Sequence, residues 1–381
     1  MASRTVDLVA LGPPPLDPYE PCATAWALAG AFAARGDEVR VLHPEGLSGA
    51  PPPPGATSVV VPLSLRRPGT AAEGAEFAGA AGRRVRHNAD LIVRDPSGLG
   101  ALHPPGGRSR APIVAFVRSV ELHAFDQEHA NQVSTGWVGR LDRWRDRRSL
   151  RRLERDALTE ADVLFAETPD LARSVGQEYA IPERRCRSIA PPVPDLPRPA
   201  SRTAARAALG IPPDVPVVAA PAAEERAGPA GIDRAREAFR RVRPFFPGAR
   251  LVVVGAPAPE DPGIVVVTAR DPAAFGLGLS AANVALFAGG PPGFDPMVVE
   301  AMRAECTVAA VPSVRLPIDP NGAVQYAVSD DPGDLASTLA ELLADPALCR
   351  EVAARGTTHA ANYAPERVVA EVDAALPSRG R

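Results

Sequence analysis

The chain of 381 residues contains no lysine, so arginine supplies all 42 of its Lys+Arg charges. Cysteine is scarce as well: Cys22, Cys186, Cys306 and Cys349 lie far apart, and their spacing fits neither a disulfide framework nor a metal site. No apolar run reaches the roughly 18 residues that cross a membrane. Residues 1–12 lack the apolar core of a secretory signal and read as a strand, so we expect a cytoplasmic protein.

An excess of positive charge is also missing. The formal net charge of −3 argues against general nucleic-acid binding, so no nucleic-acid partner is expected. The hydrophobic share of 45% and the charged share of 23% are those of a soluble globular protein, and the length allows two domains. Arginine in place of lysine, together with 44 prolines and abundant alanine, is typical of a GC-rich genome such as that of an actinobacterium.

Apolar strands and helices alternate along the N-terminal half. A strand at 6–12, an alanine-rich helix at 22–36 closed by Gly36, and a strand at 38–44 form a βαβ unit, which implies a parallel sheet. The pattern continues with strands at 57–63, 89–96, 111–119 and 161–168 and a long charged helix at 140–160.

The C-terminal half repeats this alternation. The proline-rich stretch 190–200 can form neither a helix nor a central strand, and it predicts a stiff linker between two domains. Beyond it we expect strands at 215–221, 249–257, 263–269, 283–289 and 307–313, and helices at 231–243, 296–304, 332–344, 346–355 and 365–376.

Residues 283–311 carry the most specific motif. An apolar strand runs into a Gly/Pro loop that ends at Asp295-Pro296, and a helix follows. This segment resembles the donor-sugar site of the family 4 glycosyltransferases of the GT-B fold, which reads E-G-F-G-x-x-x-x-E-A-M-A-x-G. The chain matches that motif at Gly293, Phe294, Glu300, Ala301 and Met302, and departs from it at Pro292, which replaces the first glutamate, and at Glu305, which replaces the last glycine.

The resemblance covers nearly the whole chain and implies its architecture. It predicts an α/β protein of GT-B type, with two Rossmann-like doubly wound parallel-sheet domains facing a central cleft. The N-terminal, acceptor-side domain is expected to span 1–190, the linker 191–200 and the C-terminal, donor-nucleotide domain 201–364. A helix within 365–381 then crosses back to the first domain, as in the family.

The resemblance also implies the donor contacts. The donor is a nucleotide sugar, and neither a metal nor a cofactor is expected. The family's equivalent of Glu300 contacts the ribose hydroxyls of the nucleotide, and a structural hydrogen bond is the alternative role for this residue. The other implied donor-binding residues are Gly293, Phe294, Gly231 and Gly255.

Two charges that hold the diphosphate in the family are missing here. The family grips it with an arginine and a lysine in the pattern G-R-x-x-x-x-K-G, which stabilises the leaving group. Aligning residues 231–239 puts Gly231 on the last glycine, Ala230 on the lysine and Glu225 on the arginine. Arg226 takes the catalytic role of the arginine if the loop shifts by one residue; otherwise it is a solvated loop charge.

The start of the helix at 296–304 is changed too. Asp295 is a favoured N-cap and Pro296 a favoured first helical residue. The Asp295 carboxylate would accept the amide hydrogens that a helix N-terminus offers to phosphate. Two negative groups at about 4 Å repel by about 4 kcal/mol at an effective dielectric of 20. We therefore predict a well-capped helix and a poor phosphate site.

In the first domain, Arg118 stands where the family has a histidine near the sugar, at the end of the strand 111–119. The end of a parallel strand faces the ligand side of the sheet. We expect Arg118 either to bind phosphate or an acidic acceptor as a catalytic residue, or to pair with a nearby acid such as Glu121.

Residues 137–155 carry eight arginines together with Trp137 and Trp144. Such a basic, aromatic helix can lie on anionic lipid at the inner membrane face, and related enzymes act on lipid-linked acceptors. However, Asp142, Asp146 and Glu154 are interleaved at helical pairing distances, which instead indicates a solvated, self-paired helix.

The sequence leaves two functions open. The first is a retaining glycosyltransferase that moves a sugar from a nucleotide-sugar donor to an unknown acceptor, either lipid-linked or a small metabolite. The second is a catalytically degenerate GT-B protein that binds or scaffolds an active glycosyltransferase. The departures from the donor motif motivate the second; they are Pro292, Glu225, Ala230, Asp295 and Glu305.

Overall fold

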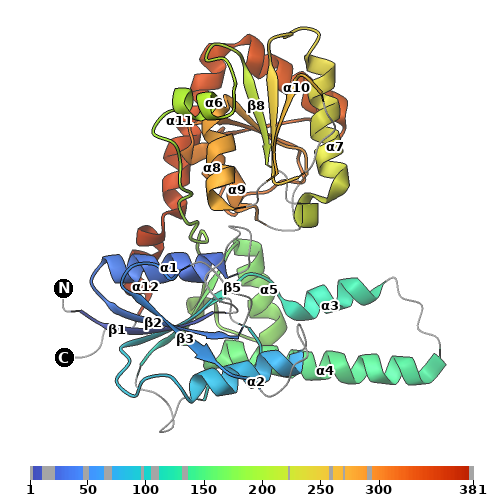
Figure 1. Ribbon diagram of the computed structural model, residues 1–381. Helices are drawn as coiled ribbons and strands as arrows, with labels where there is room; N and C mark the ends of the chain where they lie inside the picture. The colour runs from blue at the N-terminus through green and yellow to red at the C-terminus, as the bar shows by residue number, and fades with distance from the viewer. Residues whose placement is uncertain are drawn as a thin grey trace. The chain divides into compact units, whose positions relative to one another are not determined.

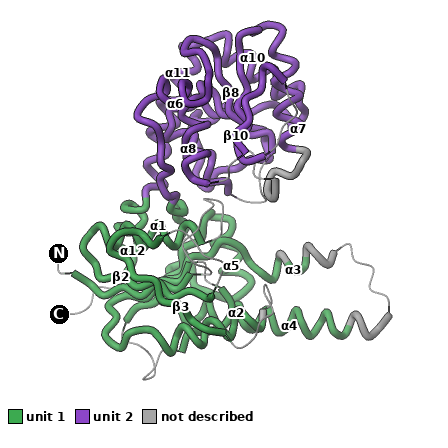
Figure 2. Tube along the Cα trace, viewed as in Figure 1, with its two compact units in different colours: residues 1–15, 20–192, 365–381 green, residues 16–19, 193–364 purple. Residues whose placement is uncertain are grey.

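The structure is a computed structural model that describes most of the chain. It divides into two compact units, coloured separately in Figure 2: Met1–Pro15, Glu20–Pro192 and Pro365–Arg381 form the first, and Leu16–Tyr19 and Val193–Ala364 form the second. The described residues are 3–10, 22–45, 51–63, 71–95, 98–103, 111–130, 136–221, 224–256, 261–268, 271–289 and 294–376, without the side chains of 71, 124, 127–130, 136–140 and 224–230.

The first unit is built on a seven-stranded sheet in the order β3-β2-β1-β4-β5-β6-β7, in which every pairing is parallel (Figure 1). The strand order reverses between β1 and β4, and such a reversal opens a crevice for ligands at the carboxyl ends of the strands. The strands are β1 (Thr5–Ala10), β2 (Glu38–Pro44), β3 (Ala56–Val61), β4 (Leu91–Asp95), β5 (Ile113–Val117), β6 (Val163–Ala166) and β7 (Cys186–Ser188).

Alternate side chains of these strands enter two apolar cores, one on each face of the sheet. One core is completed by α1 (Ala23–Ala34) and α12 (Pro365–Ala375), so the C-terminal helix packs within the first unit. Arg4 and Arg35 both pair with Asp373 on α12 and hold it there. The remaining helices are α2 (Ala71–Gly82), α3 (Glu121–Ala130), α4 (Gly136–Glu160), α5 (Pro169–Tyr179) and the short η1 (Glu183–Arg185).

The second unit has a six-stranded parallel sheet in the order β10-β9-β8-β11-β12-β13. Its strands are β8 (Val217–Pro221), β9 (Arg250–Val254), β10 (Ile264–Val267), β11 (Val284–Phe287), β12 (Thr307–Ala310) and β13 (Val324–Tyr326). Its helices are α6 (Arg202–Ala208), α7 (Glu224–Val242), α8 (Pro272–Ala281), α9 (Pro296–Arg303), α10 (Pro332–Ala344), α11 (Pro346–Ala360) and the short η2 (Ala361–Tyr363).

Four helices of this unit begin with the same dipeptide, Asp-Pro. In α8, α9, α10 and α11 the aspartate is the N-cap and accepts a backbone N–H of the first turn, while proline takes the first helical position. Proline loses nothing there, because its missing N–H would have had no partner within the helix. The local sequence therefore determines where these four helices begin.

The predicted α/β class with two doubly wound parallel sheets is confirmed. Several details differ from the sequence expectation. Helix α7 begins at Glu224, before the expected start at 231, and the short strands β7 and β13 were not expected. Val193 and Leu196 of the proline-rich stretch are buried within the second unit. Among the described helices, none is long and apolar enough to cross a membrane.

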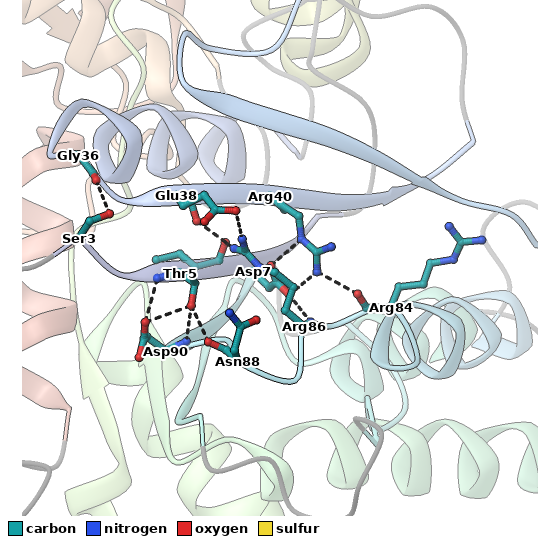
Figure 3. Close-up of polar contacts among 11 residues, drawn as sticks. Ser3, Thr5, Asp7, Gly36, Glu38, Arg40, Arg84, Arg86, Asn88 and Asp90 are labelled. Carbon is teal, nitrogen blue, oxygen red and sulfur yellow. Dashed lines mark hydrogen bonds and ion pairs between the residues drawn. The ribbon is translucent and has the colours of Figure 1, made fainter.

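One buried carboxylate ties three segments of the first sheet together (Figure 3). Asp7 on β1 is fully buried and accepts bonds from Arg40 on β2 (3.0 and 2.8 Å) and from Arg86 before β4 (2.9 Å from Nε and 2.6 Å from the backbone N–H). Arg86 also bonds the backbone oxygens of Val6 and Glu38. The pairing satisfies both carboxylate oxygens, which a buried charge requires.

We expect Asp7→Asn to lower the free energy of unfolding by about 3–5 kcal/mol, because it leaves two arginines around a neutral group. Urea unfolding followed by far-UV circular dichroism measures the loss. The matched control is Glu351→Gln, which breaks the exposed Glu351–Arg355 pair on α11 and should change stability by less than about 1 kcal/mol. Equal effects of the two substitutions would contradict the anchoring role of Asp7.

Candidate functional site

Three neighbouring strands of the first unit end in charged residues. Asp95 is the last residue of β4, Arg118 directly follows β5, and Glu167 directly follows β6. Because β4, β5 and β6 are adjacent and parallel, these ends lie at one edge of the sheet. This edge is where doubly wound sheets bind ligands, so the three side chains form the candidate site of the first unit.

Arg118 lies at the centre of this group. Its Nε donates to Asp95 Oδ1 at 2.9 Å, and one terminal nitrogen contacts both Asp95 oxygens at 2.6 and 2.8 Å. The same nitrogen bonds the hydroxyl of Thr24 near the start of α1, and the other terminal nitrogen bonds Glu167. Asp95 is 0% exposed and the Arg118 side chain 18% exposed, so the cluster is largely shielded from water.

The cluster combines one cation with two carboxylates and is therefore net negative. Burial raises the pKa of Glu167, the positive charge of Arg118 opposes that rise, and the negative charge of Asp95 adds to it. Burial on its own lowers the pKa of Arg118, but the two carboxylates outweigh it and raise the pKa. A guanidinium held in this way offers little attraction to a phosphate group.

The alternative expectation that Arg118 pairs with a nearby acid is confirmed, but its partners are Asp95 and Glu167 rather than the suggested Glu121. Glu121 instead accepts a hydrogen bond from the hydroxyl of Ser119 at 2.8 Å. The partners that sequence reasoning missed, Asp95 and Glu167, share a signal: each is the acid that ends an apolar strand segment, LIVRD or VLFAE. This pattern marks both acids as candidate partners of Arg118, but which strand ends meet depends on the order of the strands in the sheet.

The candidate site of the second unit begins at the carboxyl end of β11. Asp295 caps α9 by accepting the Met297 N–H at 2.9 Å, with Pro296 in the first helical position, so the predicted capping is confirmed. Pro292 and Gly293, which belong to the motif, lie outside the described residues. Glu305, at the family's glycine position, keeps the left-handed backbone that glycine favours, with φ of 58°.

Glu300 is 1% exposed and uses both carboxylate oxygens within the second unit. One oxygen accepts the Leu196 N–H at 3.0 Å, and the other bonds Arg303 at 2.6 Å. Arg303 in turn donates to the carbonyl oxygens of Val193 and Tyr363 and pairs with Asp195. Glu300 therefore makes structural hydrogen bonds that hold the proline-rich stretch against α9.

The pKa of Glu300 is shifted by the same surroundings. Burial raises the pKa of this carboxyl, while the charge of Arg303 and the Leu196 N–H oppose the rise. A ribose hydroxyl would have to compete with both of these partners for the carboxylate.

The remaining predicted donor residues fall into different environments. Phe294 stacks on Tyr363, with ring centroids 5.4 Å apart and an interplanar angle of 12°. Gly255 follows β9 with φ of +85° and donates its N–H to the Val267 oxygen at 2.8 Å. Gly231 is buried inside α7, and the side chain of Arg226, earlier in that helix, lies outside the described residues.

Helix α4 presents charged pairs along its surface. Arg145 pairs with Asp142, Arg152 with Asp156, and the guanidinium of Arg148 lies 5.4 Å from the centre of the Trp144 ring, which is 55% exposed. Glu154 is an exception to the predicted surface pairing. It is buried, and its carboxylate accepts the N–H groups of Glu121 and Leu122 and the hydroxyl of Tyr179.

A metal site was not expected. Within the ranges that the structure describes, no three His, Cys, Asp or Glu side chains converge so as to hold a metal ion.

We expect Arg118→Gln to destabilise the first unit by about 3–5 kcal/mol, because it leaves two buried carboxylates facing each other. Urea unfolding of the full chain measures this, and the double variant Arg118→Gln with Glu167→Gln should recover part of the loss by removing one uncompensated charge. Arg151→Gln, which breaks the more exposed pair with Glu178, is the control. No coupling between the two substitutions would show that the cluster is not an electrostatic unit.

Burial of Glu300 makes stability depend on pH. The folded-state pKa of Glu300 is raised above its value of 4.5 in the unfolded chain. Between the two pKa values the folded state keeps a proton that the unfolded state releases, so stability falls as pH rises, by at most about 1.4 kcal/mol per pH unit. Glu300→Gln keeps an acceptor for Leu196 and does not titrate. As pH rises above 4.5, the free energy of unfolding of the wild type, measured in urea, should fall relative to that of this variant. A difference that stays constant with pH would contradict the raised pKa.

Residues 23–195 match the model of Glycosyltransferase Family 4, while no curated protein is matched significantly. Similar solved structures include sucrose-phosphate synthase from Thermosynechococcus elongatus, with a TM-score of 0.65, 17% identity, and coverage of 97% of this chain and 98% of that one.

Two further solved structures are similar over nearly their whole length. WaaG, a glycosyltransferase involved in lipopolysaccharide biosynthesis, has a TM-score of 0.66 at 18% identity and covers 96% of this chain and 99% of its own. HepE from Anabaena, in complex with UDP and glucose, has a TM-score of 0.62 at 13% identity, with coverage of 98% and 100%. The resemblance is thereby confirmed: residues 23–195 carry the family 4 glycosyltransferase sequence pattern, and the chain has the GT-B glycosyltransferase fold.

Proposed function

We propose that the protein transfers a sugar from a nucleotide-sugar donor to an acceptor, with retention of configuration at the anomeric carbon. The observation that carries the proposal is the segment that follows the carboxyl end of β11. Phe294 lies just before α9, and Glu300, Ala301 and Met302 lie on α9, all at motif positions. The family match in the first unit and the similar HepE structures with UDP and with UDP-glucose support it.

In this proposal the donor lies against the second unit. Gly293, Phe294, Gly255 and Gly231 would offer backbone and ring surface to the nucleotide, and Arg226 would supply the positive charge that the diphosphate needs. Glu300 would reach the ribose only by giving up one of its bonds to Leu196 or Arg303. The proposal involves no metal, so arginine and backbone N–H groups would stabilise the negative charge of the diphosphate.

The acceptor would contact the first unit at the cluster of Asp95, Arg118 and Glu167. Because that cluster is net negative, a neutral hydroxyl-bearing acceptor suits it better than an acidic one. A lipid-linked acceptor, with peripheral membrane contact through residues 137–155, is one form of this proposal, and a small metabolite is the other.

A second candidate function is favoured by a specific observation. Three charged residues at the predicted site positions are already engaged: Asp295 caps α9, Glu300 binds Leu196 and Arg303, and Arg118 binds two acids. A protein whose charged side chains all bind other parts of the fold would keep the GT-B fold but would not catalyse sugar transfer. We therefore retain a non-catalytic partner of an active glycosyltransferase as the alternative.

Thermal shift with UDP, GDP, ADP, dTDP and their glucose conjugates, with and without Mg²⁺, separates the two. A ligand at about 100 times its dissociation constant adds about 2.7 kcal/mol to stability, and we expect such a shift with one base. Arg226→Ala should abolish it, whereas Arg240→Ala, an exposed arginine on the same helix paired with Glu237, should not. No shift with any nucleotide would support the non-catalytic alternative.

The nucleotide that binds then serves in a transfer assay. Proton NMR of the anomeric signal should show the donor's configuration in the product, and an inverted product would overturn the retaining assignment. Supplying the acceptor either free or in vesicles containing anionic lipid distinguishes a small metabolite from a lipid-linked substrate.

A further inference from the structure

A cavity of about 410 Å³ lies within the second unit, at the edge of the sheet opposite to the donor segment. Its wall includes Pro216, Asn283 and Thr307, which stand just before or at the start of β8, β11 and β12. These three strands are neighbours in the sheet, so the cavity sits at their amino ends. The predicted donor segment follows the carboxyl end of β11, roughly 13 Å away along this four-residue strand.

Three arginines line the cavity: Arg202 and Arg206 from α6, and Arg350 from α11. Elsewhere in this unit, arginines such as Arg243 and Arg303 pair with a carboxylate. None of the three cavity arginines lies within ion-pair distance of a described acid. Asp214 and Glu305 also line the cavity but are exposed, so its wall carries a net charge of one positive unit.

The three arginines differ in how they are held. Arg206 is buried and donates to the oxygens of Ala281, Pro213 and Asn283, so its role is structural. Burial lowers the pKa of Arg206, the positive charge of Arg202 lowers it further, and the negative charge of Asp214 opposes both. An anion placed here would relieve that repulsion.

Arg202 and Arg350 retain donors that the protein does not use. Arg202 gives one terminal nitrogen to the Glu305 carbonyl at 3.0 Å, while its buried Nε has no hydrogen-bond partner among the described residues. Arg350 is exposed and makes no described hydrogen bond or ion pair. A planar guanidinium with open donors matches the paired oxygens of a phosphate or carboxylate group.

We propose that this cavity is a second ligand site, which binds a small organic anion bearing a phosphate or carboxylate group between Arg202 and Arg350. The volume is within the range of small-molecule sites, about 300–1,000 Å³, and suits a ligand the size of a sugar phosphate. The site does not depend on glycosyl transfer, because it lies at the amino ends of the strands, whereas the donor segment follows their carboxyl ends; Glu305 alone among the lining residues stands at a donor-motif position.

Cys349 offers a direct readout, since it lines the cavity. Its thiol lies 2.9 Å from the Thr307 hydroxyl and is partly exposed, whereas Cys22, Cys186 and Cys306 are buried. Burial also raises the pKa of Cys186 to about 11 and that of Cys306 to about 12, which suppresses their thiolate forms. Iodoacetamide should therefore label Cys349 first in the folded chain.

The test measures the rate of Cys349 alkylation by mass spectrometry in the presence of glucose 6-phosphate, inorganic pyrophosphate or citrate. At about ten times its dissociation constant, a bound anion should slow labelling about tenfold. Glucose serves as the uncharged control. Protection by the two phosphates alone identifies a phosphate ligand, and protection by citrate alone identifies a carboxylate ligand.

Arg350→Gln should weaken protection at least about tenfold, equivalent to about 1.4 kcal/mol. Because Arg350 has no described partner, this change leaves the fold intact. Arg202→Gln should have a similar effect, and Arg355→Gln on the same helix as Arg350, whose side chain pairs with Glu351 instead, should have none. Absence of protection by all three anions at about 10 mM, or protection that survives both Arg350→Gln and Arg202→Gln, would overturn the proposal.

Discussion

Pairing of buried carboxylates with arginine is the interaction on which both units depend. A buried carboxylate is costly unless its oxygens are bonded, and an arginine partner supplies both the bonds and the balancing charge. The chain has no lysine, and the planar arginine fork can satisfy two oxygens at once, so each pair also fixes the direction of the segments that carry it. The pairs are Asp7 with Arg40 and Arg86, Asp95 and Glu167 with Arg118, and Glu300 with Arg303.

These pairs have a consequence for chemistry. In both sheets the carboxyl edge is the place for ligands, and charged residues there are normally available to them. Here Arg118 and Glu300 stand at positions where the resemblance predicted substrate contacts, yet both bind other parts of their own unit. The same side chains cannot bind a phosphate or a ribose at full strength without breaking those bonds. A ligand that binds at this edge at full strength must therefore rely on other groups.

The two edges of the second sheet provide different surroundings. At the carboxyl edge, the acid Asp295 occupies the helix start where an anion would bind. At the amino edge, Arg202 and Arg350 line a cavity without a described acidic partner. The described acid Asp295 thus stands at one edge of this sheet, and arginines without a described acidic partner stand at the other. A parallel sheet keeps these two edges one strand length apart, so the two surfaces can hold ligands independently.

The sequence by itself determined the alternation of strands and helices, the Asp-Pro helix starts and the donor-like motif, because each depends on residues close together along the chain. It also singled out Arg118, Glu300 and Asp295 as candidate site residues. It could not assign the partners of Arg118, since Asp95 and Glu167 are brought beside it only when β4, β5 and β6 pair. Only the tertiary structure decided whether a charge was paired or open, because pairing depends on distances between segments far apart in sequence, as with Leu196 and Glu300 or Arg202 and Arg350.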